Sequence, residues 1–110
     1  MVEFIKGDVV IVPFPFSDLS TTKKRPALVI AALSGEDVIL CQITSKAIKD
    51  KNAISLIDSD FESGTLQQES NIRPNRLFTA DSSLILSSVG HVKRAKMTTV
   101  INKIIDIIKA

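Results

Sequence analysis

Short apolar runs separated by polar turns occupy most of the chain, a pattern typical of a small β protein. The first run lies within 7–14 and holds β-branched residues in succession at 9–12, which predicts a strand. Pro13 and Pro15 end this strand because proline has no N–H to donate to a neighbouring strand. The polar segment 17–24 is therefore expected to be an exposed loop.

Further strands are predicted at 26–33 and 38–44, and the short glycine-containing turn between them favours a β-hairpin. A weak alternation of apolar and polar residues predicts another strand at 53–57. The polar stretch 61–70 contains a glycine and is expected to be a loop.

The last two strands are expected between this loop and residue 93. Residues 71–80 predict a short edge strand that ends in a turn near Asp81. Residues 83–92 predict another strand, in which Gly90 is a candidate for a β-bulge.

The apolar pattern changes its period in the last segment, 96–110. Its apolar residues recur at the spacing of one helical face; they are Met97, Val100, Ile101, Ile104, Ile105 and Ile108. This spacing predicts an amphipathic helix. Ile107 lies outside the apolar face and is expected to point towards solvent or a partner.

Five or six strands followed by one helix predict an α+β fold, formed as a single domain over residues 1–110. The expected architecture is a small, SH3-like, partly open β-barrel of five to seven mostly antiparallel strands with a C-terminal amphipathic helix, because curling protects the sheet edges. Hydrophobic residues make up 45% of the chain and Trp and Tyr are absent, so the core must be mainly aliphatic.

The net charge of +2 is too small to indicate a polyanionic partner by itself. The basic residues nevertheless gather in four clusters, which are compatible with a shared basic surface. These clusters are Lys23, Lys24 and Arg25; Lys46, Lys49 and Lys51; Arg73 and Arg76; and Lys93, Arg94 and Lys96.

Cys41 is the only cysteine, which excludes a disulfide framework and a zinc site built from paired cysteines. It lies in an apolar run and is expected to be a small core residue. The N-terminal residues do not resemble a signal peptide, and no apolar run is long enough to span a bilayer. The expected location is the cytoplasm.

The sequence lacks the common motifs of phosphate-binding loops, dinucleotide sites, metalloproteases and serine hydrolases. The single histidine, His91, lies in a strand and is expected to be a core or edge residue. Asp58, Asp60 and Glu62 are expected to form a solvated acidic turn, so no metal or other cofactor is predicted. The chemistry that remains is that of Arg, Lys, Ser and Thr, which suits an anionic substrate.

Metal-free RNA cleavage is one reaction that needs little else. The ribose 2′-OH is the nucleophile, so the protein has only to align it, neutralise the charge on phosphorus and assist proton transfer. A fixed guanidinium and a hydroxyl donor are suited to neutralising the charge on phosphorus.

Two segments resemble the MazF/PemK family of toxin endoribonucleases. The first runs through 7–30 and ends in an Arg-Pro-Ala-Leu-Val-Ile step at 25–30; the second is Ile-Thr-Ser at 43–45, followed by basic residues. Weaker similarity continues through 70–73 and 78–81 into the terminal helix, so the resemblance covers nearly the whole chain.

The resemblance implies that Arg25 contacts the scissile phosphate and takes part in proton transfer, while Thr44 hydrogen-bonds a phosphate oxygen. It also implies a set of RNA-binding residues, which are Phe16, Ser17, Lys23, Lys24, Ser45, Lys46, Arg73 and Asn75. Some relatives carry an acidic residue where this chain has Asn75, so a carboxylate base at that position is not available here. No metal or cofactor is implied.

The same resemblance implies three partners: a single-stranded RNA substrate, a cognate antitoxin protein and a second copy of the chain in a homodimer. Structural alternatives stay open for single residues, since Arg25 is also suited to a loop, Thr44 to a strand end and Phe16 to the core. Two other functions also stay open. One is a toxin of the CcdB type, which poisons DNA gyrase without cutting RNA; the other is a catalytically silent relative that binds RNA or antitoxin.

Overall fold

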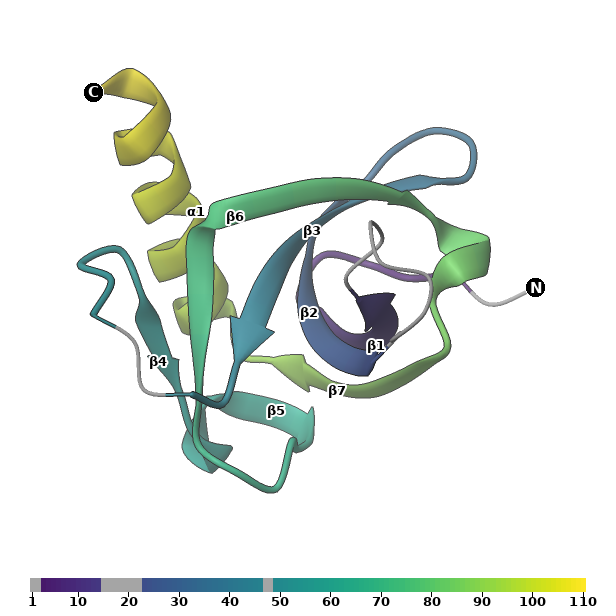
Figure 1. Cartoon of the computed structure of the whole chain (residues 1–110), viewed down its shortest axis with the longest axis horizontal. Coiled ribbons are helices and arrows are strands. Elements are labelled where there is room, and N and C mark those ends of the chain that lie inside the picture. Colours follow the sequence, from purple (N-terminus) through teal and green to yellow (C-terminus); the bar gives the residue numbers. More distant parts are fainter. Residues whose placement is uncertain (1–2, 15–22, 47–48) are drawn as a thin grey trace.

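Within residues 3–14, 23–46 and 49–110, which the computed structural model describes, seven antiparallel strands form one curled sheet beside a C-terminal helix (Figure 1). The strands are β1 (Asp8–Phe14), β2 (Lys23–Ala32), β3 (Asp37–Thr44), β4 (Ile54–Leu56), β5 (Phe61–Gly64), β6 (Ser70–Asp81) and β7 (Ser87–Val92), and the helix is α1 (Arg94–Lys109). Short 3₁₀ turns occupy Asp58–Asp60 and Ser82–Leu84. The strand order is β4-β6-β3-β2-β1-β7-β5, which confirms the predicted partly open barrel.

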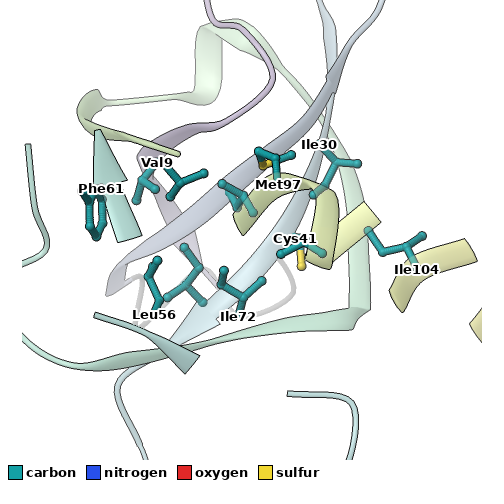
Figure 2. Close-up of a cluster of buried hydrophobic side chains, with 12 residues drawn as sticks. Val9, Ile30, Cys41, Leu56, Phe61, Ile72, Met97 and Ile104 are labelled. Carbon is teal, nitrogen blue, oxygen red and sulfur yellow. The ribbon is translucent and has the colours of Figure 1, made fainter. Parts of the chain in front are cut away.

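The central strands are buried on both faces, because the sheet curls around one apolar cluster and packs the helix against another. In β2, Leu28 and Ile30 belong to the cluster on the helix side, while Ala27 and Val29 belong to the cluster inside the curl. Figure 2 shows the helix-side cluster, in which side chains from all seven strands meet Met97 and Ile104 of α1. Strands buried on both faces need continuous apolar runs, which explains the pattern in the sequence.

The helix begins at Arg94, slightly earlier than predicted, and buries Met97, Val100 and Ile104 against the sheet. The predicted amphipathic helix is present, but its apolar face is not buried along its whole length, since Ile108 is 71% exposed. The C-terminal turns of α1 extend past the sheet and have little to pack against (Figure 1). Ile107, predicted to point outward, is half-buried.

The prediction of a short edge strand at 71–80 was wrong, because β6 is a long strand between β3 and β4. Its pairing with β3 passes from Ile43–Ile72 to Cys41–Leu77, so residues 73–76 of β6 occupy the interval that Gln42 alone spans in β3. Such a bulge bends a strand and tolerates proline within it. The bend allows β6 to belong to two parts of the curled sheet.

The predicted loop at 61–70 was also partly wrong, since residues Phe61–Gly64 form the edge strand β5, paired with β7. A Cβ atom on Gly64 would lie 2.1 Å from the Val89 carbonyl oxygen, so only glycine permits this close approach. The predicted bulge near Gly90 is confirmed by the register shift between β1 and β7. In the described chain, no helix has the length and apolar character needed to cross a membrane.

We expect the centre of β2 to dominate the stability of the fold. Replacing Leu28, which is fully buried, with Ala should lower the free energy of unfolding by about 2–5 kcal/mol, because it removes apolar contacts and leaves a cavity. Urea denaturation measures this change. Leu86→Ala is the control, since Leu86 is 53% exposed and its loss should cost less than about 1 kcal/mol. Equal costs for the two variants would contradict this view of the core.

Burial raises the pKa of the Cys41 thiol to about 12, from an ordinary value of 9.0. The folded state therefore holds the thiol protonated, and the stability that this provides is present below pH 9 and is lost as the pH rises towards 12. We expect iodoacetamide at pH 8 to label Cys41 only when urea unfolds the chain. Mass spectrometry measures the labelling, and rapid modification of the native protein would refute the expectation.

Candidate functional site

The register between β2 and β3 places Arg25 and Thr44 side by side. The antiparallel pairing ends at Ala27 and Gln42, and two residues further along each strand Arg25 and Thr44 border the same pocket. Two residues distant in the sequence thus meet at the ends of adjacent strands.

The Thr44 side chain is only 8% exposed and is held in place by the turn that follows it. Its Oγ1 accepts a hydrogen bond of 3.2 Å from the backbone N–H of Lys46. No hydrogen bond from this hydroxyl to another described residue is formed, so its proton is available to a ligand.

Arg25 is half-buried, yet it takes part in none of the ion pairs formed between described residues. A guanidinium that is partly removed from water and has no anionic partner carries an unfavourable desolvation cost. An anionic ligand would remove that cost and would find bidentate donors already in place.

These two residues border a pocket of about 250 Å³ at the ends of β2 and β3. One wall comes from β2 and β3, and the other comes from the segment that connects β5 to β6. The lining residues are Lys24, Arg25, Pro26, Ile43, Thr44, Ser45, Leu66, Gln68 and Ser70. This described lining contains two cations and no carboxylate, so it favours an anion such as a phosphate group.

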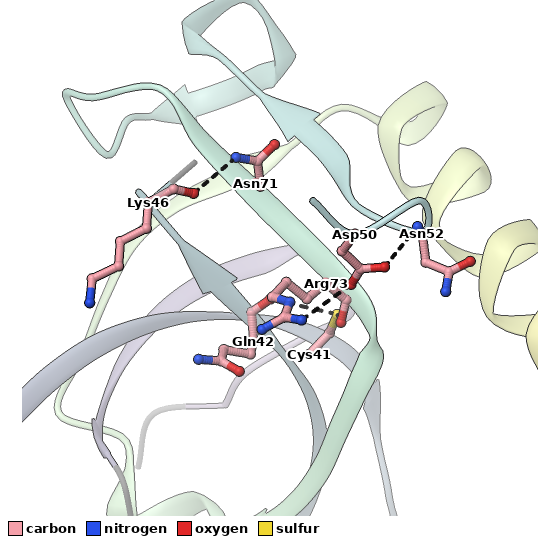
Figure 3. A network of polar contacts seen from close by, with 7 residues as sticks. All are labelled: Cys41, Gln42, Lys46, Asp50, Asn52, Asn71 and Arg73. Carbon is pink, nitrogen blue, oxygen red and sulfur yellow. Dashed lines mark hydrogen bonds and ion pairs between the residues drawn. The ribbon is translucent and has the colours of Figure 1, made fainter. Parts of the chain in front are cut away.

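Arg73, which was predicted to bind RNA, lies in a different environment from Arg25. Its Nη2 atom is 3.3 Å from Oδ2 of Asp50, and its side chain is 19% exposed (Figure 3). The Asp50 carboxylate also accepts a 2.9 Å hydrogen bond from the backbone N–H of Asn52. Arg73 does not line the pocket, and its charge is already balanced.

The pKa of the Asp50 carboxyl is lowered, first by the hydrogen bond from the Asn52 N–H and then by Arg73, with a smaller contribution from the Asn75 side chain. Asn75, another predicted RNA-binding residue, therefore belongs to this network and lies outside the pocket lining. The network joins the segment after β3 to the bulge of β6.

The remaining predicted RNA-binding residues fall into two groups. Lys23, Lys24, Ser45 and Lys46 are all exposed around the ends of β2 and β3. The Lys46 carbonyl accepts a 3.5 Å hydrogen bond from Asn71, which helps to hold this turn on β6 (Figure 3). Phe16 and Ser17 lie outside the described residues.

His91 lies away from the pocket, with its Nδ1 atom 2.9 Å from Oδ1 of Asp8 on β1. His91 lies in β7, which pairs with β1 on one side and β5 on the other, so the predicted alternative of an edge residue was wrong. Asp58 and Asp60 form the short 3₁₀ turn, where Asp60 pairs with Lys96 at 3.4 Å. The described residues contain no group of His, Cys, Asp and Glu able to hold a metal ion.

Sequence reasoning missed the second wall of the pocket. Leu66, Gln68 and Ser70 belong to the stretch that was expected to be a plain loop. They face β2 only because β5 pairs with β7 and the chain then returns to β6, a long-range arrangement that leaves no local pattern in the sequence.

Comparison with solved structures identifies the fold. A MazF from Deinococcus radiodurans is similar with a TM-score of 0.76 at 17% identity, covering 100% of both chains. An endoribonuclease from a mycobacterial species, solved in complex with its cognate antitoxin, has a TM-score of 0.74 at 15% identity and covers 97% of this chain and 96% of its own. At these identities the likeness establishes a MazF-like fold.

The sequence identifies the family. Residues 5–108 match the PemK-like, MazF-like toxins of type II toxin–antitoxin systems, and the chain therefore belongs to that family. This confirms the resemblance seen in the sequence. The Mycobacterium tuberculosis toxin MazF-mt6 is a further structural relative, with a TM-score of 0.69, 15% identity and coverage of 93% and 96% of the two chains. A comparison with curated proteins gave no significant match.

The network around Asp50 predicts a specific acid sensitivity. Since the folded-state pKa of Asp50 is lowered, the stability that its carboxylate provides is present above the ordinary pKa of 3.8 and is lost as the pH falls below it. We expect wild type to be more stable than Asp50→Asn at pH 7, and this difference to shrink below pH 4. Thermal unfolding at several pH values measures it. Asp106→Asn, at an exposed helix position, is the control, and a pH-independent effect of Asp50→Asn would count against the network.

Proposed function

We propose that this toxin is a metal-independent endoribonuclease that cleaves single-stranded RNA and thereby inhibits growth. The observation that carries the proposal is that the half-buried Arg25, which has no ion-pair partner among the described residues, and the Thr44 hydroxyl border one pocket whose described lining has no carboxylate. The structural relative described as an endoribonuclease supports the same activity.

In the proposed reaction, the 2′-OH of the substrate attacks the adjacent phosphorus and the bond to the 5′ oxygen of the next nucleotide breaks. The 2′-OH proton passes to water, and the leaving 5′ oxygen takes a proton from water. The products are a 2′,3′-cyclic phosphate and a 5′-hydroxyl. Arg25 donates hydrogen bonds to the non-bridging oxygens, where negative charge develops, and Thr44 donates one more. The Lys46 N–H holds the Thr44 hydroxyl in place, so this donor needs little reorganisation when the charge forms.

The described pocket lining offers no histidine or carboxylate that would act as a general base. The contribution of the described residues is therefore charge neutralisation and alignment of the attacking hydroxyl. Single-stranded RNA suits this chemistry because its backbone is free to adopt the in-line geometry that a helix prevents.

Exposed lysines surround the pocket and would contact the phosphates on either side of the cut. Lys23, Lys24 and Lys46 supply three such cations, each of which would add a salt-dependent contribution to the affinity. We expect binding to weaken as salt rises, without loss of sequence preference, because these contacts do not involve the bases.

We also propose an antitoxin partner, a homodimer and action in the cytoplasm, where the RNA substrate is found. Relatives with this fold have been solved as MazE–MazF complexes and with a cognate antitoxin. An acidic antitoxin segment would suit the exposed lysines, and the exposed Ile105 and Ile108 of α1 offer apolar surface to a partner.

The test is cleavage of a long single-stranded RNA in excess EDTA, with the cut ends mapped. Arg25→Ala and Thr44→Val should each slow cleavage about a hundredfold or more, because each removes a donor to the developing charge. Thr44→Ser keeps the hydroxyl and should restore most of the activity. Arg25→Ala should change the free energy of unfolding by less than about 1 kcal/mol, since the residue lies outside both core clusters.

Arg94→Ala is the matched control, because Arg94 is an exposed arginine that borders a different pocket beside Lys6 and His91. It should cut at the wild-type rate. Failure of folded wild-type protein to cut several varied RNAs would overturn the proposal. In that case, trapped DNA breaks with gyrase would indicate a gyrase poison, and binding of RNA or antitoxin alone would indicate a silent relative.

A further inference from the structure

The segment between β5 and β6 forms the wall of the pocket that faces Arg25 and Thr44. Leu66 and Gln68 both line this pocket, whereas Gln67 lines only a second pocket beside Ile57, which Gln68 also borders. None of the phosphate-directed chemistry described above uses this wall. Its residues are therefore free to contact another part of a bound nucleotide.

The wall is held in a fixed conformation. Gln67 has a φ of 63°, in the left-handed region that non-glycine residues rarely adopt, and such a conformation persists only where the surroundings impose it. The Gln67 N–H donates to Thr65 Oγ1 at 3.0 Å, and that hydroxyl donates to Asp58 at 2.5 Å. On the other side, the Ser70 hydroxyl donates to the Gln68 carbonyl at 3.2 Å.

The two side chains on this wall differ in chemistry. Leu66 is half-buried and packs against the helix-side cluster, so it offers a firmly supported apolar surface. Gln68 is exposed, and its carboxamide forms no hydrogen bond with another described side chain or backbone group. A carboxamide presents one donor next to one acceptor.

A nucleobase has the complementary chemistry. Its flat face is apolar, and its edge carries donors and acceptors side by side, as N6 and N7 of adenine do. In single-stranded RNA, these edges are open to a protein. A base attached to a phosphate at Arg25 would lie within the same pocket of about 250 Å³.

We propose that Leu66 and Gln68 bind the nucleobase next to the scissile phosphate, and that the Gln68 carboxamide selects this base. The inference rests on the proposed ribonuclease function for its substrate class. It assigns sequence selection at one position to the segment between β5 and β6.

The experiment has a binding arm and a cleavage arm. In the first, wild type, Gln68→Leu and Gln67→Leu each select from a randomised single-stranded RNA pool in which fluorine replaces every 2′-OH, so that cleavage is impossible. In the second, the same proteins cut a randomised RNA pool and the cut sites are sequenced. Gln67→Leu is the matched control, because it makes the same change at the neighbouring residue outside this pocket.

We expect Gln68→Leu to lose about tenfold in base discrimination at one position, which is a position of the selected sequence in the binding arm and a position beside the cut in the cleavage arm. Gln68→Glu should shift the preference at that same position towards cytosine, whose N4 group donates to a carboxylate. Gln67→Leu should keep the wild-type preference. The exposed position of Gln68 means that these variants should fold, which circular dichroism checks.

An unchanged preference in Gln68→Leu would overturn the inference, as would a wild-type protein that binds the pool without any base preference. If wild type shows a preference that depends on Gln68 but does not cut RNA, then the ribonuclease proposal fails and the inference stands. If wild type cuts RNA with a preference that does not depend on Gln68, the inference fails and the ribonuclease proposal stands.

Discussion

The antiparallel pairing of β2 with β3 is the constraint on which the rest of the structure depends. Both strands are buried on both faces, so their register is held by two apolar clusters at once. A slip of one residue would turn every side chain of a strand to the opposite face and would separate Arg25 from Thr44. The geometry of the candidate site is therefore a direct consequence of the core.

Arg25 and Arg73 have the same side chain but different surroundings, and their interactions differ accordingly. Arg73 is neutralised by Asp50, and together they fasten the segment after β3 to the bulge of β6. Arg25 lies at the pocket with no ion-pair partner among the described residues. A guanidinium that forms an ion pair within the protein stabilises the fold. A guanidinium without such a pair is able to form its ion pair with a ligand instead.

Much of the fold was predictable because local patterns report burial. The β-branched run at 9–12 lies in β1, and the helical spacing that begins at Met97 lies in α1. The errors have physical causes that lie outside any local window. Residues 73–76 form a bulge within the long-range pairing of β6 with β3, and Ile108 is exposed because the end of α1 extends past the sheet (Figure 1).

The sequence by itself determined the α+β class, the aliphatic core, the family and the choice of Arg25 and Thr44, since these depend on residue type, spacing and similarity. Only the tertiary structure decided that Arg73 is paired with Asp50 and that Leu66 and Gln68 complete the pocket. Those contacts join segments far apart in the chain, and they form only once the curled sheet has brought the segments together.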